Sequence, residues 1–465
     1  MTLLLSVLPI AVLVVALTAL KLPAWCAALA AFATGAIEAF WAFDLTVAGI
    51  AGQAAKGAAT GLFPIGLVIV SALFTYAITV ESDAIAEIKG GLSSLSDDSR
   101  FLALLIAWGF GNFMEGMAGF GTAVAIPCAI LVGVKFDPLK AILCCLVANT
   151  TPTAFGSVGV PTMVLASETA LDLGRLTTTI AVLQFFATSL SPFIILYIVD
   201  GWRGIRECWR LAVISDVALL SSWLVIAPTL GCELPNIVGG LLTMAALAMI
   251  GGKRGGMDAK RQLWAWQPFG YVVLALGCAA LLPPERKISP GIVILIAAFV
   301  GGFCQGLGFL RILGLAWRTV VRYAPALLTI CAVLALAKVM GAAGMTQTLA
   351  DALIAATGAG YSAVSSVVGA LAGFVTGSGT SSNVLFGSLQ TSVASTEAER
   401  YIFAAANVMG AGIGKMVCPQ SLVLGCAAAG FAGREREVMA KVFRFFLLVL
   451  AAACLATFAA VRIAA

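Results

Sequence analysis

The stretch of sequence that decides the fold is a polar window, Asn149-Thr150-Thr151-Pro152-Thr153-Ala154-Phe155-Gly156-Ser157, which is followed by Pro161. A second window, Asn407-Val408-Met409-Gly410-Ala411-Gly412-Ile413-Gly414-Lys415, is followed by Pro419. The matching Asn, Gly and Pro positions are each separated by 258 residues (407 − 149, 414 − 156 and 419 − 161). Both windows interrupt apolar sequence. The spacing therefore indicates an internal duplication.

A Gly-rich polar stretch lies just before each window. In the first half it is Asn112-Phe113-Met114-Glu115-Gly116-Met117-Ala118-Gly119-Phe120-Gly121-Thr122, and in the second it is Thr376-Gly377-Ser378-Gly379-Thr380-Ser381-Ser382-Asn383. Interrupted hydrophobic segments at matched places in two halves of a chain indicate the binding site of a secondary transporter.

The composition is that of a membrane protein. Apolar residues make up 61% of the 465 residues and charged residues 11%, whereas soluble domains are nearer half apolar and a quarter charged. The first twenty residues lack a basic start and a cleavage site, so we expect them to be a retained span. The twelve Cys show no metal-ligand spacing, and we predict neither a metal site nor a cofactor. The net charge of +5 indicates basic loops that set orientation, not nucleic-acid binding.

The predicted fold class is an all-α polytopic membrane protein with about 12 transmembrane helices, two re-entrant hairpins and two inverted-topology repeats with broken helices. Residues 1–61 form N-terminal spans and residues 201–321 form connecting spans. Repeat 1 covers 62–200, with a hairpin at 101–135 and a broken helix at 137–166. Repeat 2 covers 322–465, with a hairpin at 360–392 and a broken helix at 400–431. The predicted spans are 2–20, 22–43, 62–81, 137–166, 175–199, 210–230, 233–250, 268–282, 290–308, 322–341, 400–431 and 442–463.

Loop charges predict the orientation of these spans. Basic residues cluster in four loops, which the positive-inside rule places in the cytoplasm. Counting spans outward puts both termini outside and makes the two repeats, about 62–200 and 322–463, inverted relative to one another. The four clusters are Arg203, Arg206, Arg210; Lys253, Arg254, Lys260, Arg261; Arg311, Arg318, Arg322; and Arg434, Arg436, Lys441, Arg444.

Glu115 and Lys415 are the sharpest single candidates. A carboxylate in an intramembrane turn is costly and usually functional, so Glu115 is a candidate proton site; alternatively it supports a helix terminus or pairs with Lys415. Lys415 pairs with a substrate carboxylate, pairs with Glu115, or extends its amine to the cytoplasmic face. The chain contains no His, so any proton relay rests on carboxylates.

The remaining candidates surround the predicted helix breaks. Free N–H groups at half-helix N-termini suit a small anion. Asn149 and Asn407 are expected to begin the unwound segments, where each caps a half-helix or touches ligand. Some hydroxyls of the second Gly-rich stretch, 376–383, are expected only to form hydrogen bonds with backbone groups. The full set of candidate substrate- or proton-binding residues is Glu115, Gly116, Gly119, Gly121, Thr122, Asn149, Thr150, Thr151, Thr376, Gly377, Ser378, Thr380, Ser381, Ser382, Asn383, Asn407, Lys415 and Gln420.

At these residues the chain resembles the L-lactate permease family, which also includes glycolate permeases. The resemblance extends from Lys21-Leu22-Pro23-Ala24 to the last predicted span. Gly379 stands where the family usually carries Asp or Asn, and Ala123 stands where it often has Pro. The resembling stretches are Glu115 to Thr122 with Val124 to Pro127, Ala148-Asn149-Thr150, Thr376-Gly377-Ser378, Thr380-Ser381-Ser382-Asn383, Gly414-Lys415-Met416 and Pro419-Gln420-Ser421.

The resemblance implies a secondary transporter of the bacterial cytoplasmic membrane that imports small 2-hydroxy monocarboxylates (L-lactate, D-lactate, glycolate) with protons. Its expected partners are the carboxylate, the proton and the lipid bilayer. Two alternatives stay open at the level of the sequence: a transporter of another small organic anion (a sulfo- or dicarboxylate), or a passive anion channel on the same scaffold. An intramembrane enzyme is not supported, because no His, zinc-ligand pattern or paired intramembrane Asp motif is present.

Overall fold

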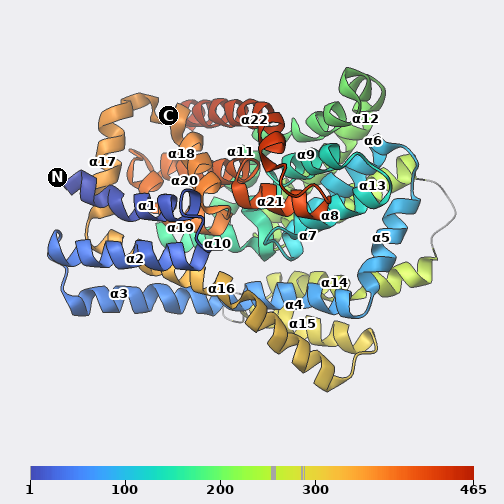
Figure 1. The fold of residues 1–465 in the computed structure, drawn as a ribbon, viewed down its shortest axis with the longest axis horizontal. Coiled ribbons are helices and arrows are strands. Elements are labelled where there is room, and N and C mark those ends of the chain that lie inside the picture. The colour runs from blue at the N-terminus through green and yellow to red at the C-terminus, as the bar shows by residue number, and fades with distance from the viewer. Residues whose placement is uncertain (1, 253–257, 284–285, 287, 465) are drawn as a thin grey trace.

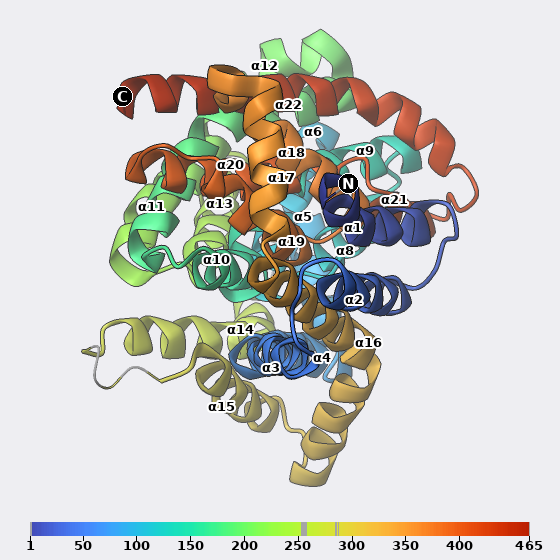
Figure 2. The ribbon, with the colours of Figure 1, turned by 90° about the vertical axis from the view of Figure 1, so that its left-hand side faces the viewer.

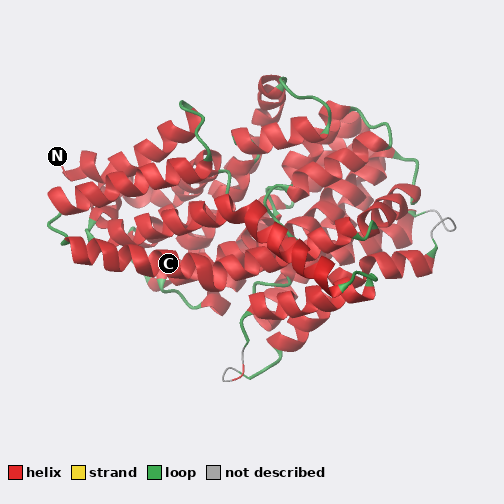
Figure 3. Cartoon of the chain, turned by 60° about the horizontal axis from the view of Figure 1, so that its bottom comes forward, coloured by secondary structure: helices red, strands yellow, loops and turns green. Residues whose placement is uncertain are grey.

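The structure is a computed structural model that describes residues 2–252, 258–283, 286 and 288–464. Lys253 and Arg254 of the second basic cluster lie outside the described residues. Within the described part of the chain every regular element is helical, and short loops join the helices (Figure 3).

The helices of the first half of the chain are α1 (Thr2–Thr18), α2 (Ala24–Trp41), α3 (Val47–Thr60), η1 (Gly61–Gly66), α4 (Leu67–Glu81), α5 (Ala84–Ser94), α6 (Ser99–Leu102), η2 (Ala103–Phe110), α7 (Gly111–Met117), α8 (Thr122–Gly133), α9 (Pro138–Ala148), η3 (Pro152–Phe155), α10 (Gly156–Thr169), α11 (Leu173–Thr188) and α12 (Ser191–Leu230).

Those of the second half are α13 (Pro235–Gly251), α14 (Ala259–Ala280), α15 (Pro290–Cys304), α16 (Phe309–Ala342), α17 (Met345–Thr357), η5 (Gly358–Gly360), α18 (Tyr361–Thr376), α19 (Gly379–Ser392), α20 (Glu397–Lys415), α21 (Pro419–Ala428) and α22 (Glu435–Ala464).

Six described helical stretches are long and apolar enough to cross a membrane, and the number rises to eight if each of two bent pairs is one span. The predicted total of about twelve spans stays a prediction. Two predicted boundaries move considerably. The span expected at 62–81 begins at Val47, because α3, η1 and α4 form one stretch of 35 residues, and the span expected at 322–341 begins at Phe309. Figure 1 shows α3 and α4 lying in line, one after the other, in the lower half of the view.

Helix starts and breaks follow the local sequence. Asp137 caps α9 by accepting a hydrogen bond from the backbone N–H of Lys140, and Pro138 occupies the first turn, where its missing N–H costs nothing. Thr396 and Glu399 form a capping box at the start of α20. Helical structure is interrupted at residues 118–121, between the α6–η2–α7 run and α8, and at 377–378, between α18 and α19. The re-entrant hairpins at 101–135 and 360–392 stay a prediction.

Both predicted broken helices are bent. The first bends by 66° between α9 and the η3–α10 segment, and the second by 44° between α20 and α21. The expectation that Asn407 begins an unwound segment is wrong, because Asn407 lies in the middle of α20. The first window contains Pro152, which lacks an N–H and ends α9 early. The second window has no proline before Pro419, so its helix continues to Lys415.

The helices separate into two groups in Figure 2. A base layer is formed by α3, α4, α14, α15 and α16, in which α16 packs against α3 and α4 while α15 packs against α4 and α14. The hairpins and bent helices lie above it. Each hairpin's second helix packs on the far half of the other bent helix, α8 on α21 and α19 on α10. Such reciprocal packing is compatible with the inverted repeats, which stay a prediction.

Candidate functional site

A cavity of about 130 Å³ lies where both hairpin tips and both helix bends meet. Drug-sized ligands occupy pockets of roughly 300–1,000 Å³, so this cavity suits a much smaller molecule. The lining residues are Ala24, Glu115, Phe120, Gly121, Val124, Asn149, Thr153, Gly156, Ser157, Pro161, Ala326, Thr329, Ile330, Thr376, Gly377, Ser378, Gly379, Thr380, Ser381, Lys415, Gln420, Ser421 and Leu424.

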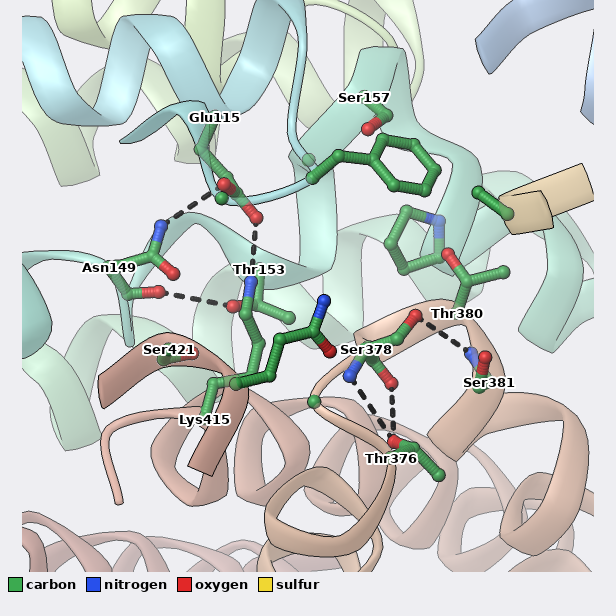
Figure 4. Close-up of a pocket in the computed structure, with 18 of the residues that line it drawn as sticks. Glu115, Asn149, Thr153, Ser157, Thr376, Ser378, Thr380, Ser381, Lys415 and Ser421 are labelled. Atoms are coloured by element: carbon green, nitrogen blue, oxygen red, sulfur yellow. Dashed lines mark hydrogen bonds and ion pairs between the residues drawn. The ribbon is translucent and has the colours of Figure 1, made fainter. Parts of the chain in front are cut away.

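A buried ion pair forms one wall of the cavity. The Lys415 Nζ donates to Glu115 Oε1 at 2.8 Å, and the Asn149 side-chain amide donates to Glu115 Oε2 at 3.1 Å (Figure 4). The side chains of Glu115 and Lys415 are only 5% and 10% exposed. Both carboxylate oxygens therefore have donors, which is what a buried charge requires. Of the three sequence alternatives for Lys415, the structure shows the pair with Glu115.

Glu115 and Lys415 are the only charged residues among the described lining residues. The remaining polar surface consists of hydroxyls, amides and backbone, so the wall of the cavity carries one positive and one negative charge. No group of three or more potential metal ligands occurs among the residues that the structure describes.

The amino ends of several helices meet at the cavity. Gly121 precedes α8, Ser378 is the N-cap of α19, and Gln420 and Ser421 lie in the first turn of α21. The amino end of a helix carries a partial positive charge, which favours an anion. The convergence predicted from the half-helices is therefore present in the geometry.

The backbone beside Glu115 adopts unusual conformations. Ser157, Val158 and Gly159 have left-handed φ angles of 45°, 57° and 77° at the start of α10. The Ser157 hydroxyl donates to the carbonyl of Ala118 at 3.1 Å. A Cβ added at Gly119, where φ is +62°, would collide with that hydroxyl, so Gly119 permits the close approach of the hairpin tip to α10. Left-handed non-glycine residues cost energy and cluster at functional sites.

Ten of the eighteen predicted site residues line the cavity. They come from both hairpins and both bent helices, so the structure joins positions far apart in the sequence. The ten are Glu115, Gly121, Asn149, Thr376, Gly377, Ser378, Thr380, Ser381, Lys415 and Gln420.

The other eight predicted site residues are not in the cavity wall but support it. Gly116 lets α7 approach Asn236 and Ile237 of α13. The Thr122 hydroxyl donates to the carbonyl of Gly119, and the Thr150 hydroxyl donates to the carbonyl of Val147. The Thr151 carbonyl accepts from the Gln184 amide. Gly119 is described above, and the last three are Ser382, Asn383 and Asn407.

Asn383 and Asn407 belong to a buried hydrogen-bond network behind the cavity. The Asn407 amide donates to Asn383 Oδ1 at 2.9 Å, and the Asn383 amide donates to the carbonyl of Pro161 at 2.9 Å. Gln390 donates to Asn407 Oδ1 at 3.1 Å. Ser382 is fully buried beside them, outside the cavity wall. This network fixes α19 between α10 and α20.

Several lining residues were not predicted. Thr153, Gly156 and Ser157 lie in the first quoted window and Ser421 in the last resembling stretch, so polar character beside a break could have identified them. Ala326, Thr329 and Ile330 come from the apolar helix α16. No sequence signal marks those three, because only packing places α16 against the hairpin tips.

The chain is similar to known proteins in both sequence and fold. The sequence model of the family described as L-lactate permease matches residues 2–254 and 279–464. The chain is 34% identical to the L-lactate permease of Streptococcus iniae over 73% of this chain and 79% of that protein. It is 30% identical to Glycolate permease GlcA of Escherichia coli over 96% of this chain and 93% of that protein. It is 31% identical to the L-lactate permease of Bacillus subtilis over 87% of this chain and 86% of that protein.

Among solved structures, the fold is similar to that in the crystal structure of the Alcanivorax borkumensis YdaH transporter, with a TM-score of 0.52 over 90% of both chains. The sequence identity is 16%, so this likeness concerns the fold alone. Family match, curated relatives and apolar helices agree: this is a multi-pass membrane protein, and the chain belongs to the L-lactate permease family.

Proposed function

We propose that this chain imports small 2-hydroxy monocarboxylates such as lactate and glycolate together with protons across the bacterial cytoplasmic membrane. Relatives named as L-lactate and glycolate permeases support the substrate class. The single observation that carries the coupling is the Lys415–Glu115 pair at 2.8 Å on the cavity wall. In this proposal, ten of the eighteen predicted site residues form the wall of the binding cavity, and the other eight support that wall.

The pair offers a direct means of coupling. When Glu115 is ionised, its carboxylate is paired with the Lys415 amine, and an incoming substrate carboxylate must compete with Glu115 for that amine. When a proton binds Glu115, the attraction between the two side chains falls, and Lys415 becomes available to the substrate carboxylate. A proton and a monocarboxylate together add no net charge to a buried site. Binding the anion alone would leave an unbalanced charge in a low-dielectric environment, which is costly.

Uptake into proteoliposomes tests this proposal. We expect purified wild-type protein to accumulate labelled L-lactate or glycolate above equilibrium when the outside is made acidic. Glu115→Gln cannot titrate, so it should still exchange labelled for unlabelled lactate but should lose accumulation driven by the pH gradient.

Two results would contradict the proposal. Unchanged pH-driven uptake by Glu115→Gln would remove Glu115 as the proton site. Wild-type flux that never concentrates the acid against its gradient would instead indicate a passive anion channel.

A further inference from the structure

The tip of the second hairpin contains polar groups that the proposed coupling mechanism does not use. Residues 376–381 all line the cavity, opposite the Glu115–Lys415 pair in Figure 4. Two of their hydroxyls are occupied within the turn. The Thr376 hydroxyl donates to the carbonyl of Ala372 at 2.8 Å, and the Ser378 hydroxyl accepts from the backbone N–H of Ser381 at 3.3 Å. These two stabilise the break itself.

The hydroxyls of Thr380 and Ser381 have no hydrogen-bond partner in the described structure, although the two residues are only 8% and 5% exposed. Helical Ser and Thr usually bond back to a carbonyl three or four residues earlier. Ser392 on the same helix does so, donating to the carbonyl of Ser388 at 2.8 Å. Buried polar groups in native proteins are nearly always satisfied, so a ligand or water in the cavity is the natural partner of both hydroxyls.

The backbone at this place adds two further donors. The N–H of Ser381 donates to the Ser378 hydroxyl, and the N–H of Ser382 donates to the Ser378 carbonyl. The N–H groups of Gly379 and Thr380 occupy the first turn of α19, where no helix carbonyl is available. Gly379 has no side chain to cover them. A Cβ there would lie 2.5 Å from Thr153 Cγ2, so the tip packs closely on the first bent helix.

The chemistry of this end differs from that of the Lys415 end. It has neutral donors and hydroxyls that both donate and accept, and no formal charge. Such groups match an uncharged oxygen on the carbon next to a carboxylate. A 2-oxo oxygen accepts from the N–H and hydroxyl donors, and a 2-hydroxyl can accept from them while donating to a Ser or Thr oxygen.

We propose that Thr380, Ser381 and the free N–H groups at the start of α19 recognise the oxygen at position 2 of the substrate while Lys415 binds its carboxylate. This inference rests on the proposed function. The site then selects short 2-hydroxy and 2-oxo monocarboxylates over acids of equal size that lack this oxygen. Propionate would leave the buried donors unsatisfied, so it should bind at least about 10-fold more weakly than lactate.

Competition for exchange of labelled lactate at one fixed pH tests the assignment. Unlabelled L-lactate, pyruvate and propionate are the competitors, and the measured quantity is the ratio of their inhibition constants within each protein. We expect Ser381→Ala and Thr380→Val each to weaken lactate and pyruvate several-fold while leaving propionate unchanged. Ser392→Ala is the matched control, since it removes a hydroxyl of the same helix outside the cavity.

The ratio is measured within one protein, so partial misfolding of a variant does not imitate the expected result. If both variants leave the lactate-to-propionate ratio at the wild-type value, the assignment is wrong while lactate transport stands. If wild-type protein neither binds nor exchanges any of the three acids, the proposed function itself fails and this inference fails with it. Loss of proton coupling with the ratio shift intact would instead contradict only the coupling mechanism.

Discussion

At the scale of single residues, the pairing of Glu115 with Lys415 explains how two charged side chains can be buried in this apolar protein. Their separation in sequence is 300 residues, and either side chain alone would be an unbalanced charge in an apolar environment. The Asn149 amide completes the coordination of the carboxylate. Removing one partner of a buried pair is usually far more destabilising than replacing both, because the remaining charge is left without compensation.

Lys415→Met should therefore lower the free energy of unfolding by about 3–5 kcal/mol. The double variant Glu115→Gln/Lys415→Met should recover most of this loss, since it leaves no buried charge. Neither should bind lactate. Apparent unfolding temperatures of the purified proteins in one detergent give the comparison. A double variant as unstable as Lys415→Met would show that packing of the lysine stem, and not charge, sets the stability.

Asp98 provides a pH-dependent contact outside the membrane spans. Hydrogen bonds from the Arg100 guanidinium, the nearer one at 2.9 Å from Arg100 Nη2 to Asp98 Oδ2, lower the pKa of the Asp98 carboxyl below its usual value. A lowered folded-state pKa contributes stability above the unfolded value, near 3.9 for Asp, and this contribution is lost as the pH falls through the folded value.

Asp98→Asn keeps a good helix-capping residue but removes the charge. We expect it to unfold at a lower temperature than wild type at pH 7, and we expect this difference to shrink as the pH falls through the lowered pKa of Asp98. Thermal unfolding of both proteins across this range is the measurement. A difference that is constant with pH would exclude the charge as its cause.

At the scale of elements, two glycines of the second window, Gly410 and Gly414, pack α20 against α18 and do not unwind it. A Cβ at Gly410 would collide with the carbonyl of Ser366, and one at Gly414 with the carbonyl of Ala370. Gly369 and Gly373 of α18 are equally close to α20. Small residues four apart allow membrane helices to approach at backbone distance. This contact holds Lys415, at the end of α20, against the first half of the chain.

Gly414→Ala should destabilise the protein by about 1–3 kcal/mol through overpacking. Gly277→Ala is the matched control, because Gly277 lies within α14 with open space around it. A helical Gly→Ala change without a clash is stabilising by roughly 0.5–1 kcal/mol. Opposite signs of the shift in unfolding temperature are expected. Equal shifts would mean that α18 and α20 separate easily and do not define the cavity.

At the scale of the whole molecule, the cavity is built unequally from the two helix groups. Its charges and most of its hydroxyls come from the hairpins and bent helices, whereas the base layer contributes Ala326, Thr329 and Ile330 of α16. A second ion pair joins the groups. Lys338 of α16 lies 3.0 Å from Glu168 of α10, without hydrogen-bond alignment, and the side chains are 29% and 4% exposed.

The unequal exposure of this pair predicts an asymmetry between its variants. Lys338→Gln leaves the buried Glu168 carboxylate without its partner and should lower the free energy of unfolding by on the order of 3 kcal/mol. Glu168→Gln leaves a lysine whose side chain is already 29% exposed, and should lower the free energy of unfolding clearly less. Unfolding temperatures and hydrogen exchange near the end of α10 distinguish the two. Faster exchange in Glu168→Gln than in Lys338→Gln would contradict the argument.

Much of this molecule could be predicted from its sequence because the relevant signals are local. Apolar runs specify membrane helices, since a bilayer leaves no other way to satisfy backbone groups. Pro152, Pro419 and the Gly-rich stretches indicated helix breaks, and a lone carboxylate among apolar residues indicated Glu115. The resembling stretches specified the family, which the comparisons confirm.

Only the tertiary structure decided which of these residues meet. The repeated spacing treated Asn149 and Asn407 as equivalents, but the first contacts Glu115 at a helix end and the second is buried inside α20. The partner of Lys415 and the wall from α16 likewise follow from packing between segments hundreds of residues apart. A sequence pattern records where a helix starts, stops and is apolar. The direction of a polar side chain at a break is set by which distant helix packs there, and local sequence carries no information about that choice.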